Sequence, residues 1–141
     1  MDCKIERSEQ YAVITLKESN FGDDIPALFE EKARELLRED YHNLIVVMNE
    51  ASEIDTAGVV TLRKLVRLCA TGLGILVVAT KSDDFTDLLE ESKIGDLLTL
   101  PTVEEAIDAV FMHDLENEFG AGDDDDYDDD DYEGISETKE P

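Results

Sequence analysis

Positive charge is scarce in this sequence. The 141 residues include 12 lysines and arginines against 37 aspartates and glutamates, so the formal net charge is -25. A surface of that sign is repelled by nucleic-acid backbones and by anionic membranes, because both carry dense negative charge. The composition therefore argues against nucleic acid or a membrane as a partner and favours a basic protein.

Cysteines and long apolar runs are also few or missing. Cys3 and Cys69 are far apart and lack the CxxC spacing of a thiolate zinc site, so we expect buried or idle thiols. No segment approaches the roughly 20 apolar residues that span a bilayer, and no apolar signal segment follows Met1. These absences predict a cytoplasmic protein.

The motifs of common cofactor and catalytic sites are absent as well. The sequence has no GxGxxG or GxxxxGK[ST] loop, and its aspartate runs lack the spacing of an EF-hand. His42 and His113 lie far apart at the edges of expected elements, which favours solvated surface residues over ligands or a general base. We therefore expect no cofactor, no metal site and no enzymatic activity.

The composition changes sharply at Glu116. Residues 116–141 contain 13 acidic residues and one lysine, including the aspartate runs at 123–126 and 128–131. Such a segment has too little apolar surface to offset the entropy of ordering, and its charges repel one another. We expect one domain over residues 1–115 and a disordered acidic tail over residues 116–141.

Within residues 1–115, apolar runs of strand length alternate with segments of helical periodicity. The patterns predict strands at 4–7, 11–16, 44–48, 75–79 and 97–100, and helices at 25–38, 56–70, 82–94 and 103–115. The third and fourth of these strands (LIVVM and ILVVA) are continuously apolar, which indicates burial on both faces. The expected fold is α/β, with a mixed sheet of four to five strands packed with about four helices.

The most informative segment joins the third strand to the second helix. It is a polar loop that ends in Asp55-Thr56-Ala57-Gly58 at the predicted helix start. Loops at the carboxyl ends of strands in α/β sheets are common docking sites. From the residues alone, Asp55 and Thr56 are either helix-capping residues or part of such a site. Gly58 fits close helix-to-strand packing better than phosphate binding, because no glycine-rich loop accompanies it.

This strand, polar loop and Asp-[Ser/Thr]-[Ser/Ala/Thr]-Gly helix start resemble the signature of STAS domains, as in bacterial anti-sigma factor antagonists. The likeness covers residues 4–113 and includes the strand that follows the glycines in GLGILVVA. It implies a STAS-like fold and a regulatory binding protein. It also implies that Thr56 is the phosphoacceptor, and that Glu53, Asp55, Thr56, Ala57 and Gly58 bind the partner.

The implied partners are a serine/threonine kinase and a phosphatase. The kinase is an ATP-using anti-sigma factor that the unphosphorylated protein sequesters. Phosphorylation of Thr56 would add roughly -1.5 to -2 charges at a helix start, where an anion is tolerated. We therefore expect the domain to stay folded while the docking surface, beside Asp55 and Glu53, becomes repulsive to an acidic partner face.

Two further functions remain open at this stage. An aspartate-phosphorylated receiver domain needs an Asp at the end of the third strand, where this chain has Met48 and Asn49. The second function is that of a STAS-like interaction subunit that is not phosphorylated and whose acidic tail binds a basic partner by charge. Phosphate analysis of the native protein would separate a threonine ester, an acyl phosphate and no phosphate.

Overall fold

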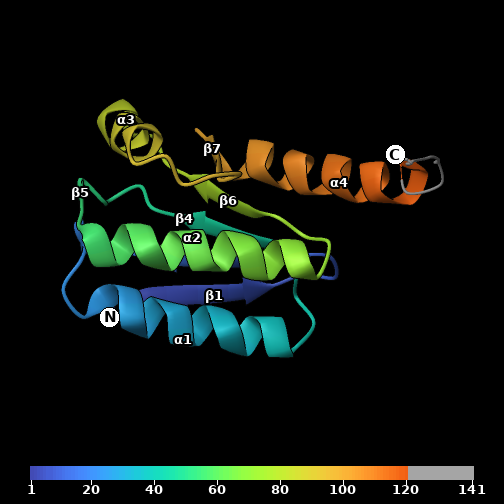
Figure 1. Cartoon of the computed structure of the whole chain (residues 1–141), viewed down its shortest axis with the longest axis horizontal. Coiled ribbons are helices and arrows are strands. Elements are labelled where there is room, and N and C mark those ends of the chain that lie inside the picture. The colour runs from blue at the N-terminus through green and yellow to red at the C-terminus, as the bar shows by residue number, and fades with distance from the viewer. Residues whose placement is uncertain (121–141) are drawn as a thin grey trace, which may run out of the picture. The chain divides into compact units, whose positions relative to one another are not determined.

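The computed structural model of the chain (Figure 1) describes residues 1–120. Residues Met1–Val110 form one compact unit. The strands are β1 (Cys3–Arg7), β2 (Ala12–Leu16), β3 (Asn20–Phe21), β4 (Leu44–Val47), β5 (Glu53–Ile54), β6 (Leu76–Ala79) and β7 (Leu98–Leu100). The helices among the described residues are α1 (Ile25–Arg38), α2 (Thr56–Thr71), α3 (Asp83–Glu91) and α4 (Val103–Gly120).

Five strands form a mixed sheet in the order β1-β2-β4-β6-β7. β1 is antiparallel to β2, with Ile5 opposite Ile14, and the other neighbouring pairs are parallel. The two central strands, β4 and β6, are buried along their whole length, as parallel strands covered on both faces are. The α/β architecture with a five-stranded mixed sheet confirms the expected fold class.

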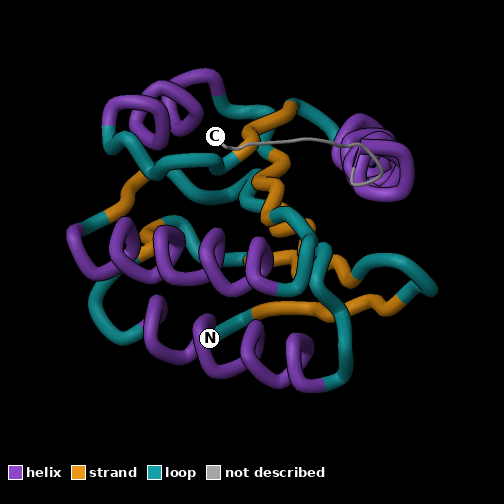
Figure 2. The backbone as a smooth tube through the Cα atoms, turned by 45° about the vertical axis from the view of Figure 1, so that its right-hand side comes forward, coloured by secondary structure: helices purple, strands orange, loops and turns teal. Residues whose placement is uncertain are grey.

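Two apolar clusters cover the two faces of the sheet. On one face, α1 and α2 run side by side (Figures 1 and 2), and their side chains pack with β-strand residues and with α3. The rings of Phe21 and Phe29 meet there edge to face, with centroids 5.3 Å apart. On the other face, Ala106 and Val110 of α4 pack against Ile45 and other residues of the central strands. β4 contributes side chains to both clusters, so it is packed on both faces of the sheet.

The helix starts follow local sequence signals. Pro26 occupies the first turn of α1, where its missing N–H costs nothing. The hydroxyl of Ser82 accepts a hydrogen bond from the Phe85 N–H at 3.1 Å and caps α3. The hydroxyl of Thr102 accepts one from the Glu105 N–H, also at 3.1 Å. The starts of α3 and α4 agree with the predicted helices at 82–94 and 103–115.

α2 ends at Thr71, and Gly72 is its C-cap residue. The residue with left-handed backbone geometry is Leu73, with φ of 66°, and it lies between Gly72 and Gly74. Gly74 is required for another reason, because a Cβ there would collide with the backbone carbonyl of His42. The ring of His42 also packs against Gly72, and its Nδ1 is buried without a hydrogen-bond partner. His42 is therefore half-buried rather than solvated.

Some element boundaries also differ from prediction. β3 and β5 were not expected, since two residues are too few to show a strand pattern. α4 continues to Gly120, five residues beyond the predicted helix end at residue 115. The proposed domain boundary at residue 116 thus falls inside a helix, and most of the proposed tail, residues 121–141, lies outside the described residues.

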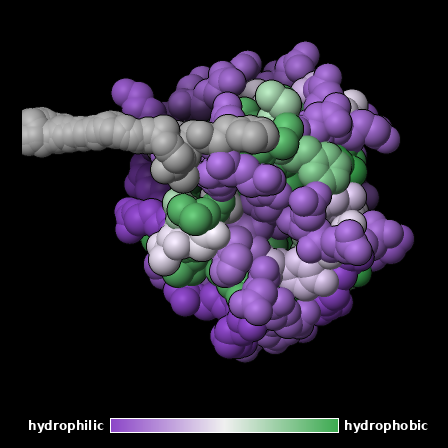
Figure 3. Space-filling view, turned by 90° about the vertical axis from the view of Figure 1, so that its right-hand side faces the viewer, coloured by the Kyte–Doolittle hydropathy of each residue, from purple (hydrophilic) through white to green (hydrophobic). Residues whose placement is uncertain are grey.

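The surface seen in Figure 3 is mostly hydrophilic, and the apolar side chains on that face form small, separate groups. Within residues 1–120, no helix is both long and apolar enough to cross a membrane.

Candidate functional site

Two loops at the carboxyl ends of β2 and β4 are joined by a short parallel strand pair. Asn20 and Phe21 of β3 pair with Glu53 and Ile54 of β5. The carbonyl of Ser19 accepts hydrogen bonds from the backbone N–H groups of residues 52 and 53, at 2.8 and 3.2 Å. Figure 2 shows that β5 leads directly into α2. The start of α2 is therefore fixed to the loop that follows β2.

Asp55 caps α2 and also binds the neighbouring loop. Its Oδ1 accepts a hydrogen bond from the Gly58 N–H at 2.9 Å, and its Oδ2 accepts one from the Asp23 N–H at 3.0 Å. These two hydrogen bonds hold the pKa of the Asp55 carboxyl below its ordinary value, because both favour the ionised form. The bond from the Gly58 N–H has the larger effect, and the bond from the Asp23 N–H comes next. The helix start therefore carries a negative charge at neutral pH.

Two glycines allow the close packing of this corner. A Cβ on Gly58 would collide with the backbone carbonyl of Phe21 and would lie 2.7 Å from Cγ1 of Ile54. A Cβ on Gly22 would lie 2.8 Å from Oδ2 of Asp55. The expectation that Gly58 serves helix-to-strand packing is confirmed by this contact. Gly58 itself is buried, so it does not contribute to the exposed surface of the site.

Thr56 is the first residue of α2 and is exposed. The capping hydrogen bond belongs to Asp55, so the interpretation of both residues as caps holds for Asp55 only. No hydrogen bond of the Thr56 hydroxyl is present among the described residues. An exposed hydroxyl on an anchored helix start is accessible to a modifying enzyme or a binding partner.

The surroundings of Thr56 are acidic. Glu53, Asp55 and Ala57 are all exposed, and Asp23 is held against the site by its bond to Asp55. The structure thus brings four of the five predicted partner-binding residues to the surface around Thr56 and buries Gly58. Their role in binding stays a prediction.

The exposed face of α2 extends beyond the predicted residues. Val60, Arg63 and Arg67 follow Thr56 at steps of four, three and four residues, which places all of them on one side of a helix. All are exposed, and the Val60 side chain is 41% accessible. This exposed face could have been predicted from the sequence, because Val60, Arg63 and Arg67 follow Thr56 at helical spacing.

The carboxyl end of β4 offers no acidic cluster. Oδ1 of Asn49, just after β4, accepts a hydrogen bond from the Lys81 N–H at 2.8 Å. No group of three or more possible metal-ligating side chains occurs within residues 1–120. This part of the molecule therefore lacks the carboxylate set with which a receiver domain holds magnesium.

Comparison with known proteins supports the fold. No family model and no curated protein matches the sequence significantly. A candidate anti-sigma factor antagonist from Thermotoga maritima has a similar structure, with a TM-score of 0.66 and 13% identity, covering 77% of this chain and 94% of its own. An anti-sigma factor antagonist from Mycobacterium paratuberculosis matches with a TM-score of 0.66 and 14% identity, over 78% and 93% of the two chains.

A third similar structure is that of the anti-sigma factor antagonist SpoIIAA in its unphosphorylated form. Its TM-score is 0.60 at 19% identity, and the match covers 78% of this chain and 98% of that one. At these identities the likeness concerns the arrangement of strands and helices. The chain has the fold of anti-sigma factor antagonists, the STAS fold that the Asp55-Thr56-Ala57-Gly58 segment resembles.

Proposed function

We propose that this protein is a regulatory binding protein of the anti-sigma factor antagonist type, switched by phosphorylation of Thr56. Its partners are a serine/threonine kinase of the anti-sigma factor kind and a phosphatase that restores the free hydroxyl. The observation that carries the proposal is the exposed position of Thr56, directly after the capping Asp55 at the start of α2. As part of the same proposal, the protein acts in the cytoplasm without a cofactor.

The surroundings of Thr56 indicate that its phosphorylation would change the docking surface and leave the fold intact. The phosphate would project from an exposed position and stay hydrated, so the buried packing of Gly58 against Phe21 is not disturbed. It would add roughly -1.5 to -2 charges beside the ionised Asp55. Unit charges 4 Å apart interact by about 1 kcal/mol in water, and several such terms are enough to release a partner.

Phosphorylation by the native kinase is the direct test. The protein is used to recover its kinase from the source cell, and the pair is incubated with ATP before phosphopeptide mapping. We expect one phosphate, on Thr56, that is retained in Thr56→Ser and lost in Thr56→Ala. Ser52→Ala is the matched control, because Ser52 is an exposed hydroxyl in the same loop. Phosphate on another residue, with Thr56 unmodified, would contradict the proposal.

Partner binding tests the consequence of the modification. Thr56→Glu adds a negative charge at the same position, and we expect it to weaken kinase binding while the circular dichroism spectrum and melting temperature stay near those of the wild type. Thr56→Gln, which is similar in size and uncharged, separates charge from bulk. If Thr56→Glu binds as tightly as the wild type, charge at this position is not the switch.

A further inference from the structure

Three basic side chains that form no ion pair meet at one pocket. Four cations of the described chain, Lys4, Arg7, Arg34 and Lys64, pair with glutamates at 2.8 to 3.5 Å. Arg63, Arg67 and Lys93 are among the cations that have no carboxylate partner within residues 1–120, although the whole chain has 37 acidic residues against 12 basic ones. Their charge is therefore open to carboxylates from outside.

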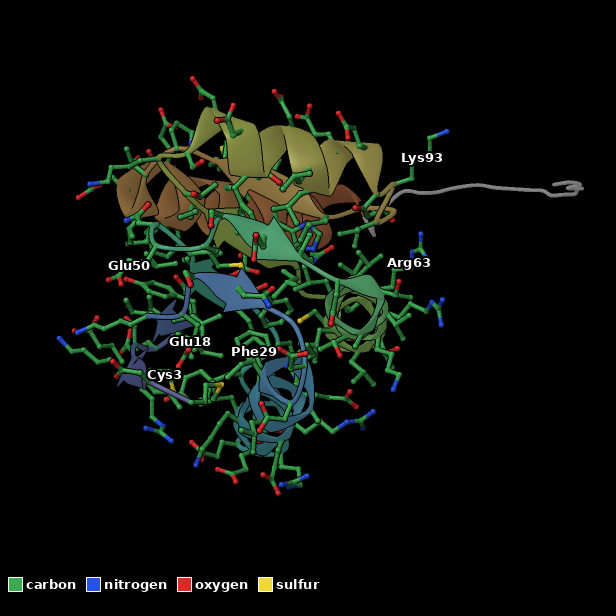
Figure 4. The ribbon with its side chains drawn as sticks, turned by 90° about the vertical axis from the view of Figure 1, so that its left-hand side faces the viewer. Cys3, Glu18, Phe29, Glu50, Arg63 and Lys93 are labelled. Atoms are coloured by element: carbon green, nitrogen blue, oxygen red, sulfur yellow. The ribbon has the colours of Figure 1, made fainter. Side chains whose placement is uncertain are left out.

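The pocket lies between α2 and the turn that joins α3 to β7, and has a volume of about 360 Å³. Arg63 and Arg67 border it from α2, and Lys93 borders it from the turn, with the half-buried Val66 between them. In Figure 4, Arg63 and Lys93 lie on the same side of the molecule. Asp96 is the one carboxylate in the lining, so the lining has an excess of two positive charges.

Arg63 is held in place at the edge of this pocket. Its Nη2 donates hydrogen bonds to the carbonyl oxygens of Ser92, at 3.0 Å, and of Lys93, at 3.4 Å. Lys93 and Gly95 in this turn both have positive φ, of 52° and 68°. An arginine that is already oriented loses less side-chain freedom when it binds a carboxylate.

The spacing of the cations indicates the kind of ligand. Arg63 and Arg67 are one helical turn apart, about 6 Å along the axis, and Lys93 lies across the pocket on another element. Charges that are separated in this way suit several carboxylates along a chain better than the three oxygens of one phosphate. Arginine also binds carboxylates in a bidentate geometry, and Val66 offers a small apolar contact.

We propose that this pocket binds an acidic segment of a protein partner, whose carboxylates pair with Arg63, Arg67 and Lys93. The net negative charge of the whole chain opposes such a ligand at long range. At physiological ionic strength, however, that field is screened beyond about 8 Å, whereas these pairs form at hydrogen-bond distance. The inference does not depend on phosphorylation of Thr56.

Binding of an acidic peptide to the full-length, unphosphorylated protein is the test. The probe is a twelve-residue peptide of glutamates with two leucines, and its glutamine counterpart is the uncharged control. In a ¹⁵N NMR titration at about 150 mM salt, we expect the acidic peptide to shift the amides of residues 63–67 and 92–96. The glutamine peptide should not shift them.

Charge reversal in the pocket gives the decisive comparison. We expect the double variant Arg67→Glu and Lys93→Glu to lose roughly tenfold or more in affinity, since exposed attractive pairs become repulsive. Lys17→Glu reverses an exposed cation elsewhere and should change affinity much less. The measurement uses peptide and unphosphorylated protein without kinase or ATP, so failure of this proposal and failure of the phosphorylation switch are distinguished.

Four outcomes would overturn the proposal. The first is that the acidic peptide produces no shifts at residues 63–67 and 92–96, and the second is that the double variant binds it as well as the wild type does. The third is that inorganic phosphate binds the same residues as tightly as the peptide, which would indicate a simple anion site. The fourth is that the double variant shifts the signals of residues 121–141 without any peptide, which would identify a segment of this chain as the occupant.

Discussion

The carboxylate of Asp55 accepts a hydrogen bond from the backbone N–H of Asp23 at 3.0 Å, although the two residues are 32 positions apart. The same carboxylate caps α2 through the Gly58 N–H. One side chain thus fixes both the helix start that carries Thr56 and the loop beside it. Changes at Asp55 should therefore affect two segments together.

Removal of the Asp55 carboxylate should loosen this corner and make the domain less stable at neutral pH. We expect Asp55→Ala to lower the urea midpoint and to speed amide exchange at both Asp23 and Gly58, because both N–H groups lose their acceptor. The pKa of Asp55 is lower in the folded state than its ordinary value of 3.8. The ionised carboxylate therefore contributes fully to the free energy of unfolding above pH 3.8, and this contribution is lost as the pH falls through the pKa of the folded state.

The wild-type protein should therefore lose more stability than Asp55→Ala as the pH falls below about 4. Urea unfolding at several pH values measures the difference. Asp55→Asn keeps one acceptor oxygen and serves as the intermediate case. If the free energy of unfolding depends on pH equally in the wild type and in Asp55→Ala, the ionised Asp55 carboxylate does not stabilise the folded state.

Thr56→Ala should leave the fold and stability nearly unchanged. The helix cap is Asp55, and no hydrogen bond of the Thr56 hydroxyl is present among the described residues, so we expect a change within about 0.5 kcal/mol. Chemical denaturation gives the value. A loss above about 1 kcal/mol, the typical cost of a removed cap, would show that Thr56 shares the capping role.

Gly58→Ala should destabilise the domain. The added Cβ would collide with the backbone carbonyl of Phe21, and backbone cannot move aside as a flexible side chain can. We expect a cost of about 1–3 kcal/mol, as for other overpacked sites, measured as a fall in the urea midpoint. Ala57→Ser, at the exposed neighbouring position, is the control and should change little. Equal stability of the two variants would mean that α2 is not pressed against β3.

Cys69 should resist alkylation in the native protein. Its side chain is fully buried, and this burial raises the pKa of the thiol to about 12, so almost no thiolate forms at neutral pH. Cys3 is only partly buried and should react first with iodoacetamide. Mass spectrometry under native conditions, compared with a sample in denaturant, identifies the modified residue. Rapid native modification of Cys69 would show that the core opens near α2.

Truncation after Gly120 should leave the melting temperature unchanged or slightly higher, because it removes like charge from an acidic protein. We also expect slower association with a basic partner and a weaker dependence on salt. The Debye length falls from about 10 Å at 0.1 M to about 3 Å at 1 M, so association kinetics at these two concentrations measure the effect. A large drop in melting temperature would show that residues 121–141 contribute to folding.

Much of the fold could be predicted from the sequence because the signals are local. The helical periodicity and Pro26 predicted α1 over the range that the structure shows, and the apolar runs predicted β4 and β6 as buried strands. The position of Thr56 at the start of α2 was also predictable, because an acidic residue before a helix is a common cap.

The sequence by itself determined the five strands of the main sheet, the four described helices and the start of α2. Only the tertiary structure decided the contacts between distant segments: Asp55 with Asp23, Gly58 with Phe21, and Arg63 with the turn at Lys93. The physical reason is that periodicity reports how each element presents its own apolar face. Hydrogen bonds and close approaches between loops depend instead on the strand order, which places the carboxyl ends of β2 and β4 side by side.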